Sequence, residues 1–199
     1  MTPNHKQNFF NEIASRWDSL PEQPETTTVA RFVGRCLGPS VRRVLDVGCG
    51  TGILLPYLGL DRTPREIVEL DSAEFMLLEN RKKPAATIAA HVCADARRPP
   101  FRDASFDRVI CFNTLPHLTP IEETLRHLLD CLRPGGVLSI GHSMSSEQLN
   151  RFHTGVGGPV VHDRLPAARI LGRTLSDMGV EVLCAEDESD WYCVQARKL

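Results

Sequence analysis

The stretch VLDVGCGTG, residues 44–52, joins an apolar run directly to a turn that contains three glycines. The preceding segment, RRVLDVG, is typical of a buried strand, and ILLPYLG after the turn is typical of a helix. Such a turn lets the backbone approach a ligand closely and directs helix N–H groups at it. The spacing is G-x-G-x-G, whereas the dinucleotide-binding pattern would need glycine where this chain has Ile53. Alone, the triplet is equally typical of a tight turn without a ligand.

Strands and helices alternate along the chain after this turn. Ser72 and Thr119 are expected to cap the helices that they begin. Apolar runs predict strands at 66–71, 87–95, 106–113 and 136–143, a hairpin at 180–186 and 191–198, and helices at 72–84, 119–136 and 166–179. We therefore expect an α/β fold with a doubly wound, Rossmann-like sheet of seven strands. The sheet should be mostly parallel, with an antiparallel strand from the C-terminal hairpin.

Two helices are predicted ahead of the first strand. Residues 6–20 place Phe9, Phe10, Ile13 and Trp17 on one apolar stripe at helical spacing. Residues 26–38 repeat the helical pattern and end at a Gly-Pro pair. The first helix therefore needs an apolar surface to lie against.

Composition excludes several classes of protein. The 199 residues suit one compact domain, and the net charge of −2 provides no overall field for holding a nucleic acid. The seven cysteines form no C-x-x-C pair, which argues against a zinc knuckle and a disulfide framework. No segment has the apolar length of a membrane span or a signal peptide. We expect a soluble cytoplasmic protein without membrane insertion, as a monomer or homodimer.

Two acidic residues follow the second and third predicted strands. Asp71 lies 19 residues after Gly52, where an acid can bind both ribose hydroxyls of an adenosine. The alternative is that Asp71 only places a charge at a helix N-terminus. Asp95 ends the third strand, where a carboxylate can accept from an adenine amino group and the N–H of Ala96 can reach a ring nitrogen. Both acids should face the same crevice.

Four segments together resemble a known family: VLDVGCGTG, VELDSAEFML, CADARRPPFRDASFDRVICFNTLPHL and CLRPGGVLSI. They are similar to successive motifs of class I S-adenosylmethionine-dependent methyltransferases, in particular the small ones related to the ubiquinone/menaquinone-biosynthesis enzymes. The resemblance covers residues 44–142 and extends loosely to FFNEIASRWD, which resembles that group's lid helix. It implies an N-terminal helical lid at 1–38 and an S-adenosylmethionine-binding methyltransferase domain at 39–199, within one compact domain.

The resemblance also implies a role for each motif residue. The methionine part of the cofactor would lie along Gly48, Cys49 and Gly50, with Asp46 behind the loop near its amino group. Asp71 would bind the ribose, Asp95 and Ala96 the adenine, and Asn113 would lie next to the methyl group. Ser72, which follows Asp71 directly, joins these cofactor-binding candidates. The glycine spacing fits because this cofactor has no pyrophosphate, and acids suit its cationic sulfonium.

The residues after the fourth and fifth strands are the catalytic candidates. The sequence NTLPH at 113–117 departs from the N-P-P-Y motif expected for amino-group methylation of adenine or glutamine. His117 and His142 follow the two strands at the edge where ligands bind, and either can act as a general base. A capping or surface histidine is an equally good interpretation of His117.

The segment IGHSMSSEQLNRFHTGVGGPVVHDRLP, residues 140–166, holds His142, His153, His162 and Asp163. In this fold it commonly covers the acceptor pocket, so His117, His142 and His153 are the catalytic candidates. His142, His153, His162 and Asp163 would also suit zinc, iron or nickel, although their spacing matches no metal motif. A third alternative is a solvent-exposed loop.

The resemblance implies methyl transfer from S-adenosylmethionine to a small-molecule acceptor, with S-adenosylhomocysteine as product. The alternative is a non-catalytic, sensor-like protein that binds S-adenosylmethionine or a metal. A macromolecule methyltransferase is disfavoured by the net charge and by the sequence at 113–117. The acceptor atom stays open among oxygen, nitrogen, carbon and sulfur.

Overall fold

A computed structural model describes residues 5–60 and 63–199 and shows a single seven-stranded sheet in the order β3-β2-β1-β4-β5-β7-β6. The pairs from β3 to β5 are all parallel, and only β7 runs antiparallel to its two neighbours. The strands are β1 (Arg43–Val47), β2 (Glu66–Asp71), β3 (Ala89–Cys93), β4 (Phe106–Phe112), β5 (Leu132–His142), β6 (Glu181–Glu188) and β7 (Trp191–Arg197). The predicted fold class is confirmed, including the antiparallel strand from the C-terminal hairpin.

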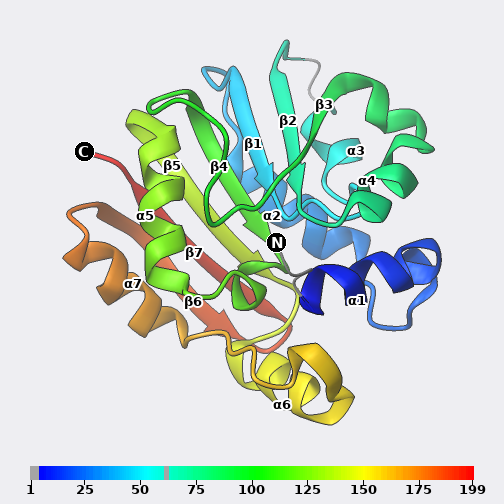
Figure 1. The fold of residues 1–199 in the computed structure, drawn as a ribbon. Coiled ribbons are helices and arrows are strands. Elements are labelled where there is room, and N and C mark those ends of the chain that lie inside the picture. Colours follow the sequence, from blue (N-terminus) through cyan, green and yellow to red (C-terminus); the bar gives the residue numbers. More distant parts are fainter. Residues whose placement is uncertain (1–4, 61–62) are drawn as a thin grey trace.

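Helices cover both faces of the sheet, and Figure 1 shows α5 and α7 in front of it and α2 behind. The α-helices are α1 (His5–Ile13), α2 (Thr26–Cys36), α3 (Leu55–Leu58), α4 (Glu74–Arg81), α5 (Ile121–Cys131), α6 (Ser146–Val156) and α7 (Ala168–Asp177). Short 3-10 turns are η1 (Ala14–Ser19), η2 (Pro84–Ile88), η3 (Leu115–His117) and η4 (Gly158–Val160).

The core lies in two layers, one on each side of the sheet. Leu125 and Leu128 of α5 and Leu171 of α7 pack with the strands on one side. Phe32 of α2 and Leu58 of α3 pack with the strands on the other. Because the central strands are buried on both faces, they read in the sequence as continuous apolar runs.

The carboxyl ends of the parallel strands meet at one edge of the sheet, and α1 and α6 lie at this edge (Figure 1). A small apolar cluster, formed by Ile13 and Ala14 with Ala73 and Met76, joins α1 and η1 to α4. The amphipathic stripe predicted for residues 6–20 therefore has its partner surface. Among the described residues, no helix is both long and apolar enough to cross a bilayer.

Two predicted helix caps are wrong, and one helix is longer than its sequence suggests. The N-cap of α4 is Ala73 rather than Ser72, and that of α5 is Pro120 rather than Thr119; neither has a side-chain cap. The N–H of Ala73 instead donates a hydrogen bond to the Asp71 carboxylate. In contrast, Ser145 forms a full capping box with Gln148 and starts an 11-residue helix. The sequence SSEQLNRFH at 145–153 predicts only one or two helical turns with Ser145 or Ser146 as cap, and α6 continues beyond them to Val156.

Candidate active site

The glycine turn after β1 uses its glycines for different purposes. Gly48, Gly50 and Gly52 all have positive φ, at 66°, 55° and 81°, a region that suits glycine. A Cβ on Gly48 would lie 2.1 Å from Cγ2 of Thr114, so the turn passes directly against the loop after β4. A Cβ on Gly50 would meet no atom within 4 Å. Gly48 therefore fixes the packing of the turn, whereas Gly50 leaves space on its open side.

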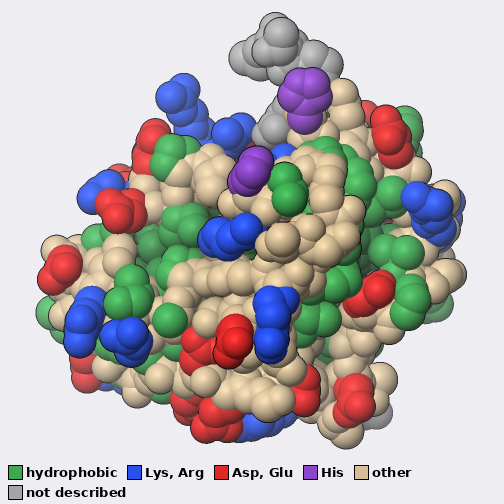
Figure 2. Space-filling view, turned by 90° about the horizontal axis from the view of Figure 1, so that it is seen from below, with side chains coloured by type: hydrophobic (Ala, Val, Ile, Leu, Met, Phe, Trp, Pro, Cys, Tyr) green, Lys and Arg blue, Asp and Glu red, His purple; other side chains and the backbone are tan. Residues whose placement is uncertain are grey.

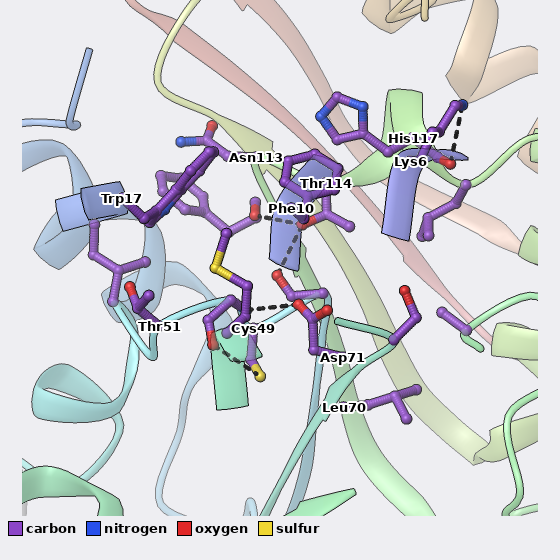
Figure 3. A pocket seen from close by; sticks show the side chains of 18 of the residues that line it. Lys6, Phe10, Trp17, Cys49, Thr51, Leu70, Asp71, Asn113, Thr114 and His117 are labelled. Atoms are coloured by element: carbon purple, nitrogen blue, oxygen red, sulfur yellow. Dashed lines mark hydrogen bonds between the residues drawn. The ribbon is translucent and has the colours of Figure 1, made fainter. Parts of the chain in front are cut away.

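Asp71, the last residue of β2, holds this turn in place. Its Oδ2 accepts from the N–H of Gly50 at 2.9 Å, and its Oδ1 accepts from the N–H of Ala73 at 2.8 Å. Burial raises the pKa of Asp71, and the hydrogen bonds from the backbone oppose that rise. A carboxylate accepts about four hydrogen bonds, so the two backbone bonds leave positions for a ligand. Asp71 lies on the cavity side of the turn (Figure 3).

Asp46 lies beneath the same turn, away from the cavity lining. It is buried, and its Oδ2 has no hydrogen-bond partner. Burial, followed by the charges of Glu69 and Asp71, raises the pKa of Asp46 well above its ordinary value. The prediction that Asp46 lies behind the loop agrees with this position.

Glu69 is a buried acid that the sequence analysis missed. It is fully buried on β2, accepts a hydrogen bond from Nδ2 of Asn80, and lies near Nε2 of His91 at 3.9 Å. Burial raises the pKa of Glu69 to about 7. The available signal was a charged residue between Val68 and Leu70 inside the apolar run EIVELD. Glu69 and Asp46 form an acidic pair behind the turn.

A cavity opens above the turn and collects most of the predicted cofactor residues. Its space, counted to the open mouth, is about 1090 Å³. The candidates that line it are Gly48, Cys49, Gly50, Asp71, Ser72, Asp95, Ala96 and Asn113. Asp95 also makes an ion pair with Arg97 at 2.5 Å. We call this space the donor pocket.

The N-terminal elements close the donor pocket from above. Phe10 of α1 and Trp17 of η1 face Asp71 and Cys49 across it (Figure 3). Oδ1 of Asp18 accepts from the hydroxyl of Thr51 at 2.5 Å, and Nε2 of Gln7 donates to the carbonyl of Ser72 at 2.6 Å. These contacts tie α1 and η1 to the glycine turn and to the end of β2.

A second, mostly apolar pocket adjoins the first, and we call it the histidine pocket. Its polar lining includes His117, His142 and His153, which the sequence selected as catalytic candidates. Six residues line both pockets: Phe10, Trp17, Glu22, Gln23, Asn113 and His117. His117 and Asn113 therefore lie where the two spaces meet.

His117 is held by an acidic residue from the far end of the segment after β5. Its Nδ1 lies 2.7 Å from Oδ2 of Asp163, and Nζ of Lys6 lies 2.5 Å from the other oxygen, Oδ1. Asp163 is 3% exposed. Burial alone would raise the pKa of Asp163, but the hydrogen bonds from His117 and Lys6 lower it. The carboxylate therefore stays ionised against His117.

The other two catalytic candidates are buried beside His117. Nδ1 of His153 lies 3.0 Å from the carbonyl oxygen of Asp163, and its ring centroid lies 5.2 Å from that of His117. His142 is 2% exposed, and its Nε2 has no hydrogen-bond partner within residues 5–60 and 63–199. Burial, with the nearby charges of His117 and His153, lowers the pKa of His142 well below its ordinary value. His142 is therefore neutral.

The metal candidates of the segment are only partly brought together. His162 is exposed, whereas His142, His153 and Asp163 are buried. Within 5–60 and 63–199, no group of three or more histidine, cysteine or acidic side chains is arranged to hold a metal ion. Asp163 instead forms hydrogen bonds, through its carboxylate with His117 and through its carbonyl oxygen with His153.

A family model described as "Methyltransferase domain" matches residues 45–140. The O-methyltransferase rstn1 of Aspergillus nomiae is 33% identical over 157 residues, which cover 69% of this chain and 67% of that protein. A demethylmenaquinone methyltransferase of Beutenbergia cavernae is 35% identical over 143 residues, covering 69% and 58% of the two chains.

Solved structures share the fold. The magnesium protoporphyrin IX methyltransferase ChlM of Synechocystis, with bound S-adenosylhomocysteine, superposes with a TM-score of 0.69 at 17% identity. The superposition covers 98% of each chain. The present chain spans about half the length of several curated relatives that it matches, between 44% and 58%.

Proposed function

The chain belongs to the class I S-adenosylmethionine-dependent methyltransferases, and from this premise we propose that it transfers a methyl group from S-adenosylmethionine to a small-molecule acceptor. S-adenosylhomocysteine is the second product. The observation that carries the proposal is the pair of pockets that meet at His117 and Asn113. Methyl transfer is an in-line displacement, and two adjoining pockets can align its two reactants.

The residues of the donor pocket fit the cofactor. The open side of Gly50 leaves room for the methionine part along Gly48 to Gly50, and Asp71 keeps acceptor positions for the ribose. Asp95, Ala96 and Ser72 line the same pocket and would hold the adenosine. When bound, the cofactor supplies a methyl group on a cationic sulfonium, which nearby acids and aromatic faces favour.

Asn113 would position the reacting groups at the junction. It is the residue after β4 and has a φ of 54°. Its Oδ1 accepts from the N–H of Ser143 at 2.9 Å, which joins the loop after β4 to the segment after β5. Asn113 thereby fixes the wall that both pockets share.

We propose that α1 and η1 act as the lid over both pockets. Their residues Phe10 and Trp17 line both spaces, and their polar contacts reach the glycine turn. The boundary between lid and methyltransferase domain at residue 38 stays a prediction. The helix α2, which lies before this boundary, packs in the core against the sheet. The lid function therefore belongs to the part before α2.

A small molecule is favoured over a polyanion as acceptor. Figure 2, a view onto one face of the molecule, shows acidic and basic side chains interspersed. The pockets are lined by aromatic and aliphatic side chains together with a few polar groups. We also propose a cytoplasmic protein that acts as a monomer or homodimer; its seven cysteines are all free thiols, as expected in a reducing compartment.

Catalysis is favoured over cofactor sensing because the relatives are named as methyltransferases. The test combines calorimetry of S-adenosylmethionine binding with S-adenosylhomocysteine release over thiol, phenol, amine, quinone-like and metalloid acceptors. We expect binding together with release for at least one acceptor class. Binding without release for any class would instead support the sensor-like alternative, and absence of binding would overturn both.

A further inference from the structure

We propose that the acceptor is a largely apolar ring compound with a hydroxyl group on the ring, such as a phenol or enol, which binds in the histidine pocket and loses its proton to His117. A second oxygen function on the same ring would pair with His142. This inference rests on the proposed methyl transfer and adds the class of acceptor.

The contact between His117 and Asp163 defines which nitrogen of His117 can act as a base. An ionised carboxylate only accepts hydrogen bonds, so the nitrogen that faces Asp163 at 2.7 Å carries the hydrogen. The lone pair of the neutral ring is then on Nε2. Because His117 lines both pockets, this base lies beside the point where donor and acceptor meet.

Lys6 shares the carboxylate that faces His117. Its ammonium group pairs with the second oxygen of Asp163 and compensates part of the negative charge beside the imidazole. An imidazole base removes a proton most readily from an acidic hydroxyl, and a phenol, with a pKa of about 10, is far more acidic than an aliphatic alcohol. The base therefore favours a ring hydroxyl over an aliphatic alcohol.

The rest of the histidine pocket is suited to an apolar ring. Its apolar lining comprises Phe9, Phe10, Ile13, Trp17, Leu20, Met144, Leu149, Phe152, Val156 and Val160. The ring of Phe10 also packs edge-on against His117, with centroids 5.2 Å apart. Flat apolar compounds would therefore be held with one edge near His117.

His142 provides a second polar contact in the same pocket. It is 2% exposed, lines the pocket, and its Nε2 has no hydrogen-bond partner among the described residues. Buried polar atoms are almost always hydrogen-bonded, so a group of the ligand is the expected partner. A neutral imidazole pairs with a hydroxyl or carbonyl oxygen function, which gives the acceptor its second polar substituent.

The reaction balances with these groups alone. As the acceptor oxygen forms its bond to the methyl carbon, its proton passes to Nε2 of His117 and the bond from carbon to sulfur breaks. The electron pair of that bond stays on sulfur, which becomes a neutral thioether. Asp163 stabilises the imidazolium, which then releases the proton to solvent.

Binding of three naphthalene probes tests the acceptor class without turnover. Naphthalene, 2-naphthol and 2,3-dihydroxynaphthalene share one ring system and carry zero, one and two hydroxyls. Quenching of tryptophan fluorescence measures their affinities, since Trp17 lines the pocket. We expect affinity to rise about tenfold or more with each hydroxyl. Equal affinity for all three probes would overturn the inference.

Two variants of His142 separate recognition from folding. His142→Phe should remove the preference for the diol over 2-naphthol, and His142→Gln should keep it. His162→Asn, at an exposed histidine of the same segment, is the matched control and should behave as wild type. A diol preference that survives in a folded His142→Phe variant would contradict the role of His142.

The base is tested with 2-naphthol as acceptor. His117→Gln should lower the rate of S-adenosylhomocysteine release by about 100-fold or more, with little change in the affinity for 2-naphthol. The visible absorbance of bound 4-nitrophenol gives a second readout, because the wild type should increase its ionisation and His117→Gln should not. Turnover of thiols or amines but of no hydroxyl probe would overturn the acceptor class and leave methyl transfer intact. No turnover with any acceptor would count against the proposed function itself.

Discussion

Nδ1 of His117 lies 2.7 Å from Oδ2 of Asp163, although 46 residues separate the two side chains in the chain. The contact joins the turn after β4 to the loop that precedes α7. The fold creates it by placing both segments at the carboxyl edge of the sheet, where β4 and β5 are paired in parallel. The same contact ties the histidine pocket to the donor pocket, because His117 lines both.

Replacing Asp163 should slow turnover without weakening cofactor binding. Asp163→Asn keeps the size of the side chain but can turn an amide N–H towards His117, which would then hold its proton on Nε2. We expect the rate of S-adenosylhomocysteine release to fall by about 100-fold or more. Calorimetry should give an unchanged Kd for S-adenosylmethionine. An equal loss of cofactor affinity would mean that Asp163 only supports the architecture.

Replacing Asp71 should weaken cofactor binding. The variant would lack the hydrogen bonds that we propose Asp71 makes to the ribose, which as bonds to a charged group are worth about 1.5–3 kcal/mol. We expect Asp71→Ala to raise the Kd for S-adenosylmethionine about 10- to 100-fold in calorimetry. Glu74→Ala, at an exposed acid in the first turn of α4, is the control and should bind as wild type. Wild-type affinity in Asp71→Ala would contradict the assignment.

Two glycines of the same turn should respond differently to alanine. In Gly48→Ala the new methyl group meets Thr114 at 2.1 Å, so we expect a loss of about 2 kcal/mol or more in the free energy of unfolding. In Gly50→Ala the methyl group enters open space, and only the positive φ costs about 1 kcal/mol. Urea unfolding with calorimetry should show Gly50→Ala folded but impaired in cofactor binding. Equal stability of the two variants would contradict this distinction.

The buried Glu69 should make the protein less stable as the pH rises. Burial raises its pKa from 4.5 to about 7, so the native state binds the proton more tightly than the unfolded chain. Its contribution is fully present below pH 4.5 and is lost as the pH rises through about 7. The loss amounts to about 3 kcal/mol.

Urea unfolding near pH 5 and pH 8 measures this loss. Glu69→Gln should lose less stability than the wild type between the two pH values, because the titrating carboxyl is gone and its charge no longer raises the pKa of Asp46. Glu66→Gln, at an exposed position on the same strand, should retain the wild-type dependence. A Glu69→Gln variant with the full wild-type pH dependence would show that Glu69 does not cause it.

Cys184 should be the most reactive thiol near neutral pH. The hydrogen bond with Cys193, at an Sγ–Sγ distance of 3.9 Å, lowers the pKa of Cys184 to about 7. Burial raises the pKa of Cys93, which is more exposed. Brief labelling with iodoacetamide at about pH 7.5, followed by peptide mass analysis, should therefore modify Cys184 first. Faster labelling of Cys93 would show that solvent exposure affects the reactivity of these thiols more than the fraction ionised to thiolate.

The order of strands and helices could be predicted from the sequence because each element carries its own pattern. The apolar run EIVELD predicts β2 at the residues where it occurs. The cap of α4 was wrongly predicted, since the N–H of Ala73 donates to Asp71, two residues earlier, and the side chain of Ser72 makes no cap. A local sequence offers several polar side chains for the same N–H, and the backbone path decides which one is used.

The residues of the candidate site, too, could be predicted from the sequence only in part. Asp71 and the glycines follow from motif spacing, but the pairing of His117 with Asp163 depends on the path of the whole segment after β5. Glu69 was missed because an acid in an apolar run is normally expected to face solvent, and here Asn80 supplies a buried partner from α4.

The contacts of the lid have a consequence for the order of events in each catalytic cycle. Lys6 forms an ion pair with Asp163, and Asp18 accepts a hydrogen bond from Thr51. These contacts attach α1 and η1 to the walls of both pockets. Under the proposed lid function, S-adenosylhomocysteine would leave only after these contacts break. The steady-state turnover rate would then be set by the rate at which the lid opens. An added viscogen would lower the rate of multiple turnovers and leave the rate of a single turnover unchanged.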